Sequence, residues 1–363
     1  MNKYKKVIHI IADLGNGGAE RQLVELLKLN PTHKLLVLKN TGVYKKELEK
    51  FNISYTELNI KNNLEVLFYF HKIGKIIKSS NTKIVHAWMY NACLLVSLIK
   101  VFYNKKFKLV WGIRCSNMQL KYYSLTLRCV ILSCKFLSFL ANSIIYNSHA
   151  GLKYHSSLGF SKRFSKVIYN GIDEKKFCFS NIKRNKLRKT LSIKRDSIVI
   201  VCAGRVDPMK NHLNLLSAFE IVRKQNKRVI LLLIGKGTEN LKAQKGVIAL
   251  GMKINIEHYY SIGDIIILPS KFGEGFSNVL AEGMLSKLFP VATKVGDSKY
   301  IISDIGLIIK DSSSKSIAKS LKSAIDINKK KLECLKIKSQ ERVKKKFSIK
   351  KMSFSYNNIY REL

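Results

Sequence analysis

Acidic side chains are scarce in this sequence. The 363 residues include 66 Lys and Arg but only 24 Asp and Glu, which gives a formal net charge of +42. Such an excess is typical of a lysine-rich composition on solvated surfaces, or of a protein that contacts anionic lipid headgroups or nucleic acid. The positive charges are spread along the chain, with the densest runs at 329–331 and 344–346. This spread argues against one dedicated patch.

Paired cysteines and metal-ligand motifs are also missing. The seven cysteines are odd in number and form no C-x-x-C pair, which disfavours a disulfide framework or a zinc site and favours a reducing, cytosolic setting. The sequence has no H-E-x-x-H motif and no D-x-D pair, so we predict no metal ion and no cofactor. The absence of a G-x-S-x-G elbow disfavours a serine hydrolase.

Long apolar runs are absent as well. The most apolar stretch, 130–145, is interrupted by Lys135 and falls short of the roughly 20 residues that span a bilayer. It is typical of a buried amphipathic helix, with a helix lying on a membrane surface as the alternative. The first residues lead directly into a predicted strand without a signal-peptide pattern. We therefore expect a cytoplasmic protein that contacts the inner face of the cell membrane peripherally.

Strand and helix patterns alternate in two successive halves of the chain. The expected strands are 6–12, 35–38, 55–58, 83–87, 109–113 and 143–147 in the first half, and 198–203, 229–234, 247–250, 265–268, 290–293 and 307–309 in the second. A turn-rich link at 167–177 separates the halves, and 314–363 is predicted to be helical. This alternation predicts an α/β protein with two mostly parallel sheets, each covered on both faces, and a ligand cleft between them.

The most informative segment is 264–285, DIIILPSKFGEGFSNVLAEGML. An apolar strand leads into a glycine loop that contains Glu274, and a helix follows with Ser277 as its N-cap and Glu282 inside it. Backbone N–H groups at a helix N-terminus bind anions, whereas carboxylates are good acceptors for sugar hydroxyls. The segment therefore predicts a ligand with a diphosphate and hydroxyl-rich rings.

A second segment, GRVDPMKN at 204–211, follows the first strand of the second half. Gly204 permits a close backbone approach at this point. Arg205 and Lys210 suit a diphosphate, because arginine binds it as a fork and lysine as a point charge. Alternatively, they are two surface cations among many.

In the first half, Gly17 and Gly18 open a predicted helix within GNGGAE. This stretch does not satisfy G-x-G-x-x-G and lacks the acidic partner about twenty residues later, which disfavours a dinucleotide-dependent oxidoreductase. His86 lies at the carboxyl end of the predicted strand 83–87, and Arg114 follows the predicted strand 109–113. A histidine in that place is either a base or a structural residue.

Together these motifs resemble glycosyltransferase family 4, which comprises retaining enzymes with the GT-B fold, two Rossmann-like doubly wound domains facing across a cleft. The resemblance extends over nearly the whole chain. It rests on GGAER at 17–21, NGID at 170–173, AGRVDPMKN at 203–211, LLLIGKG at 231–237 and the 264–284 segment with its E-x7-E motif, in the family's order and approximate spacing. VHAWMYNA and WGIR look most like the bacterial surface-polysaccharide branch.

The resemblance implies roles for the residues of the second half. Arg205 and Lys210 would hold the donor diphosphate without a divalent cation, Glu274 would contact the donor sugar, and Glu282 would bind the ribose. Further donor contacts are implied for Gly17, Gly18, Gly204, Gly275, Phe276, Ser277, Asn278 and Val279.

The first half departs from the family at one catalytic position. Many members carry a histidine where WGIR has Arg114, and His86 is the nearest alternative. Either residue is thus a candidate for the catalytic role in this half. A smaller departure is Gly296–Asp297, which replaces a glycine pair.

The resemblance also implies a domain division and a reaction. We expect an acceptor-side domain over 1–174, a donor-binding domain over 175–344, and a terminal helix at 345–363 that crosses back to the first domain. The expected reaction is retaining transfer of a hexose or N-acetylhexosamine from a UDP-sugar to a saccharide or polyprenyl-diphosphate-linked acceptor, in the synthesis of O-antigen, capsule or lipopolysaccharide.

Two other functions are weighed against this reaction. A GT-B-fold nucleotide-sugar epimerase binds a similar ligand, but the E-x7-E spacing together with GRVDPMKN argues against it. A basic nucleic-acid-binding module needs aromatics interleaved on a basic face or a recognisable docking element. The sequence shows neither, so we expect no nucleic acid partner.

Overall fold

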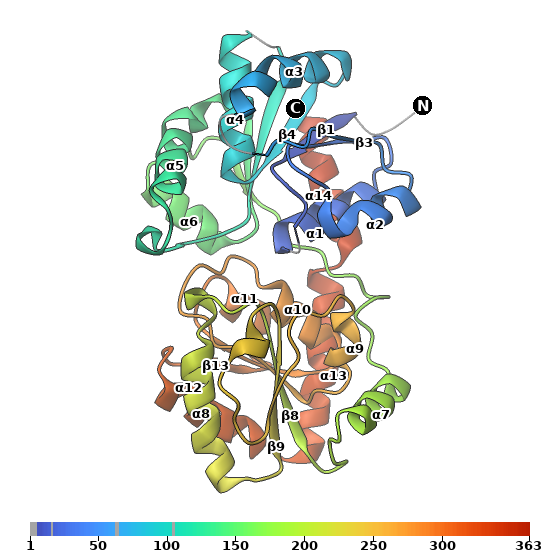
Figure 1. Ribbon diagram of the computed structural model, residues 1–363, viewed down its shortest axis with the longest axis vertical. Coiled ribbons are helices and arrows are strands. Elements are labelled where there is room, and N and C mark those ends of the chain that lie inside the picture. The colour runs from blue at the N-terminus through green and yellow to red at the C-terminus, as the bar shows by residue number, and fades with distance from the viewer. Residues whose placement is uncertain (1–5, 16, 62–64, 104–105) are drawn as a thin grey trace. The chain divides into compact units, whose positions relative to one another are not determined.

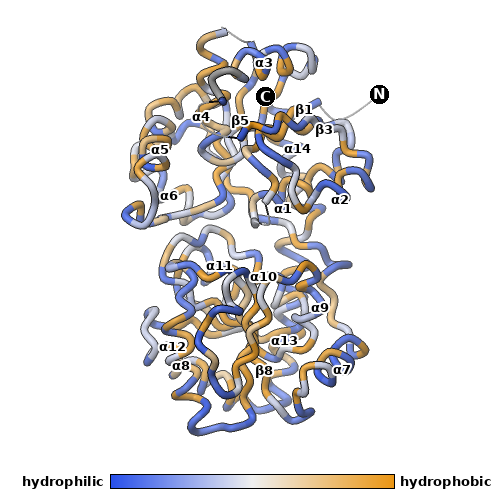
Figure 2. Tube along the Cα trace, viewed as in Figure 1, coloured by the Kyte–Doolittle hydropathy of each residue, from blue (hydrophilic) through white to orange (hydrophobic). Residues whose placement is uncertain are grey.

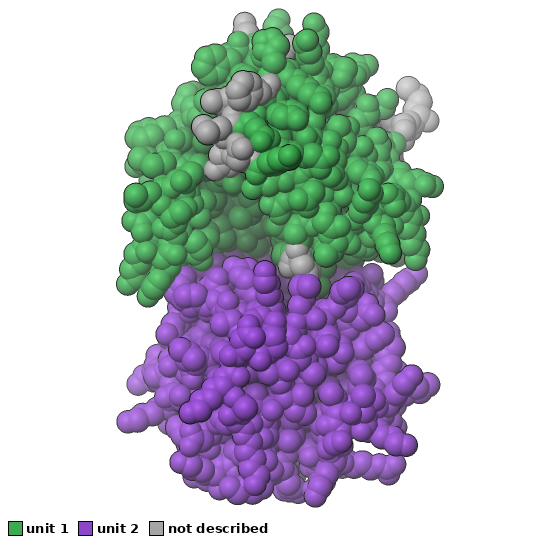
Figure 3. Space-filling model, in the orientation of Figure 1, with its two compact units in different colours: residues 1–171, 349–363 green, residues 172–348 purple. Residues whose placement is uncertain are grey.

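The computed structural model describes residues 6–15, 17–61, 65–103 and 106–363, which form two α/β units (Figure 1). Unit 1 comprises 1–171 and 349–363, and unit 2 comprises 172–348 (Figure 3). The borders thus lie a few residues from the positions 174 and 345 expected from the sequence. A parallel bridge between Ile172 and Ser348 accounts for the difference, because it pairs both ends of unit 2 at its border.

Unit 1 is built on a parallel sheet of seven described strands in the order β3-β2-β1-β4-β5-β6-β7. The strands are β1 (Val7–Ile11), β2 (Lys34–Val37), β3 (Tyr55–Glu57), β4 (Ile84–Trp88), β5 (Lys108–Ile113), β6 (Ser143–Tyr146) and β7 (Ser165–Val167). The central strands β1 and β4 are fully buried and, apart from His9 and His86, apolar, because helices cover both faces of the sheet. The short edge strand β7 was not predicted, since its residues are only half-buried and carry no apolar run.

The helices of unit 1 form two layers. They are α1 (Gly18–Lys28), α2 (Lys45–Lys50), α3 (Glu65–Ser79), α4 (Met89–Phe102), α5 (Leu125–Leu137), α6 (His149–Ser157) and α14 (Ile349–Glu362), with 3₁₀ turns η1 (Gly42–Tyr44), η2 (Leu120–Tyr122) and η3 (Ser138–Leu140). One core contains side chains of α3, α4 and α5. The other contains side chains of α1, α2 and α14, so the end of the chain is part of the interior of unit 1.

Unit 2 contains a parallel sheet of six described strands in the order β10-β9-β8-β11-β12-β13. The strands are β8 (Ile198–Ala203), β9 (Val229–Ile234), β10 (Val247–Ala249), β11 (Ile265–Leu268), β12 (Phe289–Thr293) and β13 (Leu307–Ile309). The helices are α7 (Asn181–Thr190), α8 (His212–Gln225), α9 (Ile256–Tyr260), α10 (Asn278–Leu285), α11 (Ser298–Ile302), α12 (Ser314–Ile325) and α13 (Lys329–Lys346), with η4 (Pro208–Lys210) and η5 (Thr238–Asn240). The predicted α/β architecture with two parallel sheets is confirmed.

Each sheet has a point at which the strand order reverses. In unit 1 this point lies between β1 and β4, and in unit 2 it lies between β8 and β11. Loops that leave such strands at their carboxyl ends diverge to opposite faces of the sheet and leave a crevice, in which open α/β sheets bind ligands. The two motif segments of the second half, 204–211 and 269–277, directly follow β8 and β11.

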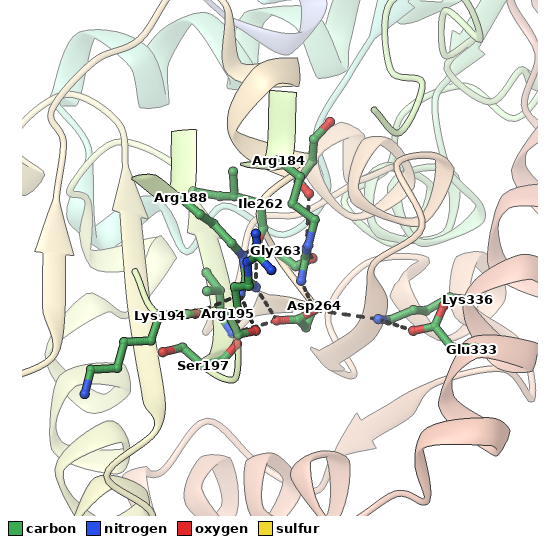
Figure 4. Close-up of polar contacts among 12 residues, drawn as sticks. Arg184, Arg188, Lys194, Arg195, Ser197, Ile262, Gly263, Asp264, Glu333 and Lys336 are labelled. Carbon is green, nitrogen blue, oxygen red and sulfur yellow. Dashed lines mark hydrogen bonds and ion pairs between the residues drawn. The ribbon is translucent and has the colours of Figure 1, made fainter. Parts of the chain in front are cut away.

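At the opposite end of β11, a cluster of ion pairs joins the sheet of unit 2 to its helices (Figure 4). The Asp264 carboxylate lies 2.7 Å from Arg184 Nη2 and 2.9 Å from Arg188 Nη2, both on α7. It also accepts the backbone N–H of Val199 at 2.9 Å and lies 3.8 Å from Lys336 Nζ on α13. One carboxylate therefore holds α7 and α13 against the start of β8 and β11.

Candidate active site

Two loops at the reversal point of unit 2 are joined by hydrogen bonds. The backbone N–H of Lys271 donates to the Met209 carbonyl at 2.8 Å. The Asn211 side-chain amide donates to the carbonyls of Pro269 and Ser312, both at 2.9 Å. These bonds fix the loops relative to each other before any ligand binds.

A buried ion pair connects the two loops. Lys210 Nζ lies 2.7 Å from Glu274 Oε1, and the Ser270 hydroxyl donates to the same oxygen at 2.7 Å. Gly204 lies under the lysine, since a Cβ there would be only 3.4 Å from Lys210 Cδ. The structure therefore brings together the cation and the carboxylate that the sequence singled out, and it adds Ser270, which the sequence analysis missed. The only sequence signal for Ser270 as a site residue is its position in the loop that follows β11.

Arg205 differs from Lys210 in its environment. Its guanidinium donates to Asp207 Oδ2 from Nη2 at 3.0 Å and from Nε at 3.2 Å. The side chain is 59% exposed, against 16% for Lys210. Because an exposed side chain reorients at little cost, Arg205 is free to turn its donor fork toward a diphosphate.

The helix N-terminus expected after the glycine loop is present. The Ser277 side chain accepts the backbone N–H of Leu280 and caps α10, as predicted. Gly275, Phe276 and Asn278 lie around this cap and are buried, and Val279 in the first turn is half-buried. The end of α10 thus provides backbone N–H groups and a positive dipole end beside the Lys210–Glu274 pair.

The Gly296–Asp297 pair supports the glycine loop. Gly296 has φ = 58°, and a Cβ there would lie 2.3 Å from the Glu274 carbonyl oxygen. The backbone N–H of Asp297 donates to the Gly275 carbonyl at 3.1 Å. Any side chain at 296 would therefore displace the backbone that carries Glu274, so this glycine belongs to the site.

Glu282 lies in the interior of unit 2. It is only 1% exposed, and its Oε2 accepts a hydrogen bond from the Tyr260 hydroxyl at 3.1 Å. Tyr260 is itself fully buried at the end of α9. No local sequence signal indicates this tyrosine, because the hydrogen bond depends on how α9 packs beside α10.

A cavity occupies the reversal point of unit 1. Its volume is about 240 Å³, and its lining includes Asp13 and Glu20 after β1, Asn91 after β4, and the apolar side chains Met118 and Leu127. The lining thus combines hydroxyl-accepting groups with apolar surface, a composition that suits a sugar ring.

The two glycines beside this cavity begin α1. Gly17 is the N-cap of the helix, and Gly18 is its first residue. A Cβ on Gly17 would lie 2.2 Å from Glu20 Oε2, so the carboxylate folds over the glycine.

Arg114 is held in the interior of unit 1. Its guanidinium donates to the Tyr356 hydroxyl at 2.6 Å and to Asn170 Oδ1, and it lies 5.3 Å from the centroid of the Trp88 ring. Because Tyr356 belongs to α14, the last helix of the chain fixes this arginine.

His86 is also interior. It is fully buried, its Nδ1 lies 2.7 Å from the Tyr360 hydroxyl, and its ring stacks on Trp88. Burial, and next the charge of Arg114, hold the pKa of His86 well below its usual value. The structure therefore places neither His86 nor Arg114 in the lining of the unit 1 cavity.

Two further observations bear on ligands. In the described part of the chain, no three His, Cys, Asp or Glu side chains gather as metal ligands, and the metal-free reaction stays a prediction. A larger cavity of about 530 Å³ lies between α8 and 242–245. Its lining contains none of the residues that the sequence analysis assigned to the donor.

Comparisons with known proteins agree with this geometry. Residues 183–342, inside unit 2 and including both of its loops, match the family of glycosyl transferases group 1. The lipopolysaccharide 1,2-N-acetylglucosaminetransferase of Salmonella typhimurium is 30% identical over 162 residues, which are 38% of this chain and 41% of that protein. A Campylobacter jejuni protein is 26% identical over 345 residues, which are 88% of this chain and 90% of that protein. It is the N-acetylgalactosamine-N,N'-diacetylbacillosaminyl-diphospho-undecaprenol 4-alpha-N-acetylgalactosaminyltransferase.

A solved structure shows the same fold. HepE of Anabaena, crystallised with UDP and glucose, superposes with a TM-score of 0.86 at 20% identity, over 99% of this chain and 100% of that one. Membership of family 4 in particular stays a prediction. Residues 183–342 are therefore similar to the glycosyl transferases group 1, and the chain is a glycosyltransferase with the GT-B fold.

Proposed function

We propose that the protein transfers a hexose or N-acetylhexosamine from a UDP-sugar to a saccharide or polyprenyl-diphosphate-linked acceptor, with retention of anomeric configuration, in bacterial surface-polysaccharide synthesis. The Lys210–Glu274 pair beside the N-terminus of α10 is the observation that carries the proposal. The relatives support the acceptor class, since one acts in lipopolysaccharide synthesis and another is named for an undecaprenol-linked substrate. HepE supports the donor class through its bound UDP.

Unit 2 would stabilise the leaving group. As the bond between the anomeric carbon and the diphosphate oxygen breaks, negative charge builds on the diphosphate and the sugar becomes cationic. Lys210 is already in place, Arg205 swings in, and the N–H groups of α10 add a dipole, so the environment needs little reorganisation at the transition state. No divalent cation is required in this scheme.

Glu274 would bind the donor sugar and not attack it. Its Oε1 is engaged by both Lys210 Nζ and the Ser270 hydroxyl, which fixes the direction of the carboxylate. A carboxylate held in this way accepts hydrogen bonds from the hydroxyl groups of a sugar ring. The acceptor oxygen then forms the new bond to the anomeric carbon, and its proton leaves with the diphosphate.

Unit 1 would bind the acceptor. Asp13, Glu20 and Asn91 line its cavity and would accept hydroxyl hydrogen bonds, while Met118 and Leu127 would contact the apolar face of a sugar. A polyprenyl-linked acceptor is anchored in a bilayer, so this proposal also places the enzyme peripherally at the inner face of the membrane.

The Lys210–Glu274 pair provides the test. We expect Lys210→Ala and Glu274→Gln each to lower the kcat of sugar transfer, measured as UDP formed, by about 100-fold or more. The reason is that each variant loses a preorganised charge contact. Lys224→Ala is the matched control, since Lys224 is 73% exposed and also lies in unit 2. Unchanged turnover in both site variants would contradict the proposal. Conversion of the UDP-sugar into its epimer without any acceptor would identify an epimerase instead.

A further inference from the structure

One face of α5 exposes a continuous apolar stripe. We call it the α5 stripe, and it consists of Leu125, Cys129, Leu132, Phe136 and, in the following turn η3, Phe139. Their spacing of four, three, four and three residues puts them on one side of the helix. The exposed fractions are 73% for Leu125, 53% for Leu132, 65% for Phe136 and 70% for Phe139.

The opposite face of α5 is already used by the fold. Ile131 and Cys134 are buried in the core that α5 shares with α4, and the Cys134 thiol donates to the Tyr90 carbonyl at 3.4 Å. The helix is therefore apolar on two sides, and most of its residues are hydrophobic (Figure 2). Only one of these sides is needed for packing. Exposed apolar patches of this kind mark interaction sites.

The surroundings of the stripe carry charge of one sign. No aspartate or glutamate occurs between Glu65 and Asp173, a stretch that contains every element from β4 to β7. Lys135 Nζ lies 5.6 Å from the centroid of the Phe136 ring, so a cation directly flanks the stripe. The positive charges are spread along the chain, as the sequence analysis found, but the acidic residues that would offset them are absent from this half of unit 1.

We infer that the α5 stripe is a docking face for an anionic lipid bilayer. The helix would lie in the plane of the interface, with its leucine and phenylalanine side chains among the acyl chains and the flanking cations at the headgroups. The stripe covers roughly 16 Å from Leu125 to Phe136 at the usual helical rise. This inference rests on the membrane location in the proposed function, and not on its chemistry.

A second copy of the chain is the weaker candidate for the same face. Two copies meeting through their α5 stripes would bring together two helices that carry basic but no acidic side chains, and such like-charge contact disfavours association. An anionic bilayer supplies the opposite charge and an apolar layer at once.

The stripe and the cavity of unit 1 share one helix. Leu127 of α5 lines the cavity, and its neighbour Leu125 begins the stripe. A membrane bound along the stripe would thus lie close to the cavity, as a sugar attached to a membrane-anchored diphosphate requires.

The test is flotation of the full chain with vesicles. We expect binding to vesicles of phosphatidylcholine with phosphatidylglycerol, weaker binding to phosphatidylcholine alone, and weakening by salt. The double variant Phe136→Glu/Phe139→Glu should bind at least about tenfold less, since two carboxylates replace inserted rings. The control Leu213→Glu/Ile254→Glu adds the same charge at positions of unit 2 that are 73% and 81% exposed, and it should bind like the wild type.

Activity on a short-chain, water-soluble acceptor keeps the two proposals apart. The stripe variant should retain this activity, which also shows that it folds, whereas failure of the proposed transfer would appear in the wild type itself. Three results would overturn the lipid assignment. They are absence of wild-type binding to phosphatidylglycerol vesicles, equal binding by the stripe variant, and a wild-type dimer in light scattering that the stripe variant converts to a monomer.

Discussion

The hydroxyl of Tyr260 fixes one oxygen of Glu282 inside unit 2. Tyr260→Phe removes this bond and leaves the ring in place. If Glu282 binds the ribose, the loosened carboxylate should raise KM for the UDP-sugar about tenfold, since a hydrogen bond to a charged group contributes about 1.5–3 kcal/mol. The kcat should change little, because the ribose does not react.

Steady-state kinetics with varied donor would measure this change. Tyr259→Phe is the control, as Tyr259 precedes Tyr260 on α9 and is only half-buried. A fall in kcat at unchanged KM would contradict a positioning role for Tyr260.

Single residues also show where sequence reasoning ends. Lys210 and Glu274 could be predicted because each lies directly after a strand, and strands β8 and β11 are neighbours at the reversal point. His86 lies near the end of β4 and Arg114 directly follows β5, yet Tyr360 and Tyr356 cover them. Those tyrosines lie at the far end of the sequence, so no local pattern indicates that the side chains are interior.

At the scale of elements, Asp264 is the residue on which the arrangement of α7, α13 and β11 depends. We expect Asp264→Ala to lower the free energy of unfolding of unit 2 by about 3–5 kcal/mol. Removing one partner of a buried pair leaves an uncompensated charge, and the side chain of Arg188 is only 6% exposed.

Denaturant unfolding followed by circular dichroism would measure this loss. Glu220→Ala is the control, because it breaks an exposed pair with Lys224 and should cost at most about 1 kcal/mol. Equal losses in the two variants would show that the Asp264 cluster does not hold the elements together.

The elements themselves were predictable to different degrees. The strands of unit 2 agree with the predicted ranges to within about one residue, because apolar runs of β-branched residues between turn residues are strong local signals. The 314–363 region was predicted as helical from its pattern, and only the family resemblance set its last part, 345–363, apart as a helix of the first domain. It forms α12, α13 and α14, which belong to two different units, and this division depends on tertiary packing.

For the whole molecule, buried histidines couple folding to pH unequally in the two units. Burial is the main cause that holds the pKa of His9 and of His86 well below the usual value, and it lowers the pKa of His155 to about 4. All three lie in unit 1. In unit 2, burial and the nearby Lys210 lower the pKa of His212 to about 4.

The sign follows from proton binding. An unfolded histidine has a pKa of about 6.5, so below that pH the unfolded chain binds protons that the folded chain excludes. The contribution of these histidines to stability is therefore constant above about pH 7 and is lost as the pH drops toward 4, by up to about 1.4 kcal/mol per pH unit for each histidine. Unit 1 has three such groups and should lose stability more steeply than unit 2.

The two tryptophans allow a direct measurement, because Trp88 and Trp111 both lie in unit 1. Denaturant midpoints from tryptophan fluorescence should fall strongly between pH 7 and pH 5, a range in which ordinary carboxylates stay ionised. Far-ultraviolet circular dichroism reports both units. At pH 5 its denaturation curve should therefore show two transitions, an early one for unit 1 that coincides with the fluorescence change and a later one for unit 2. A tryptophan midpoint that is the same at both pH values would mean that the histidines of unit 1 accept protons without unfolding it.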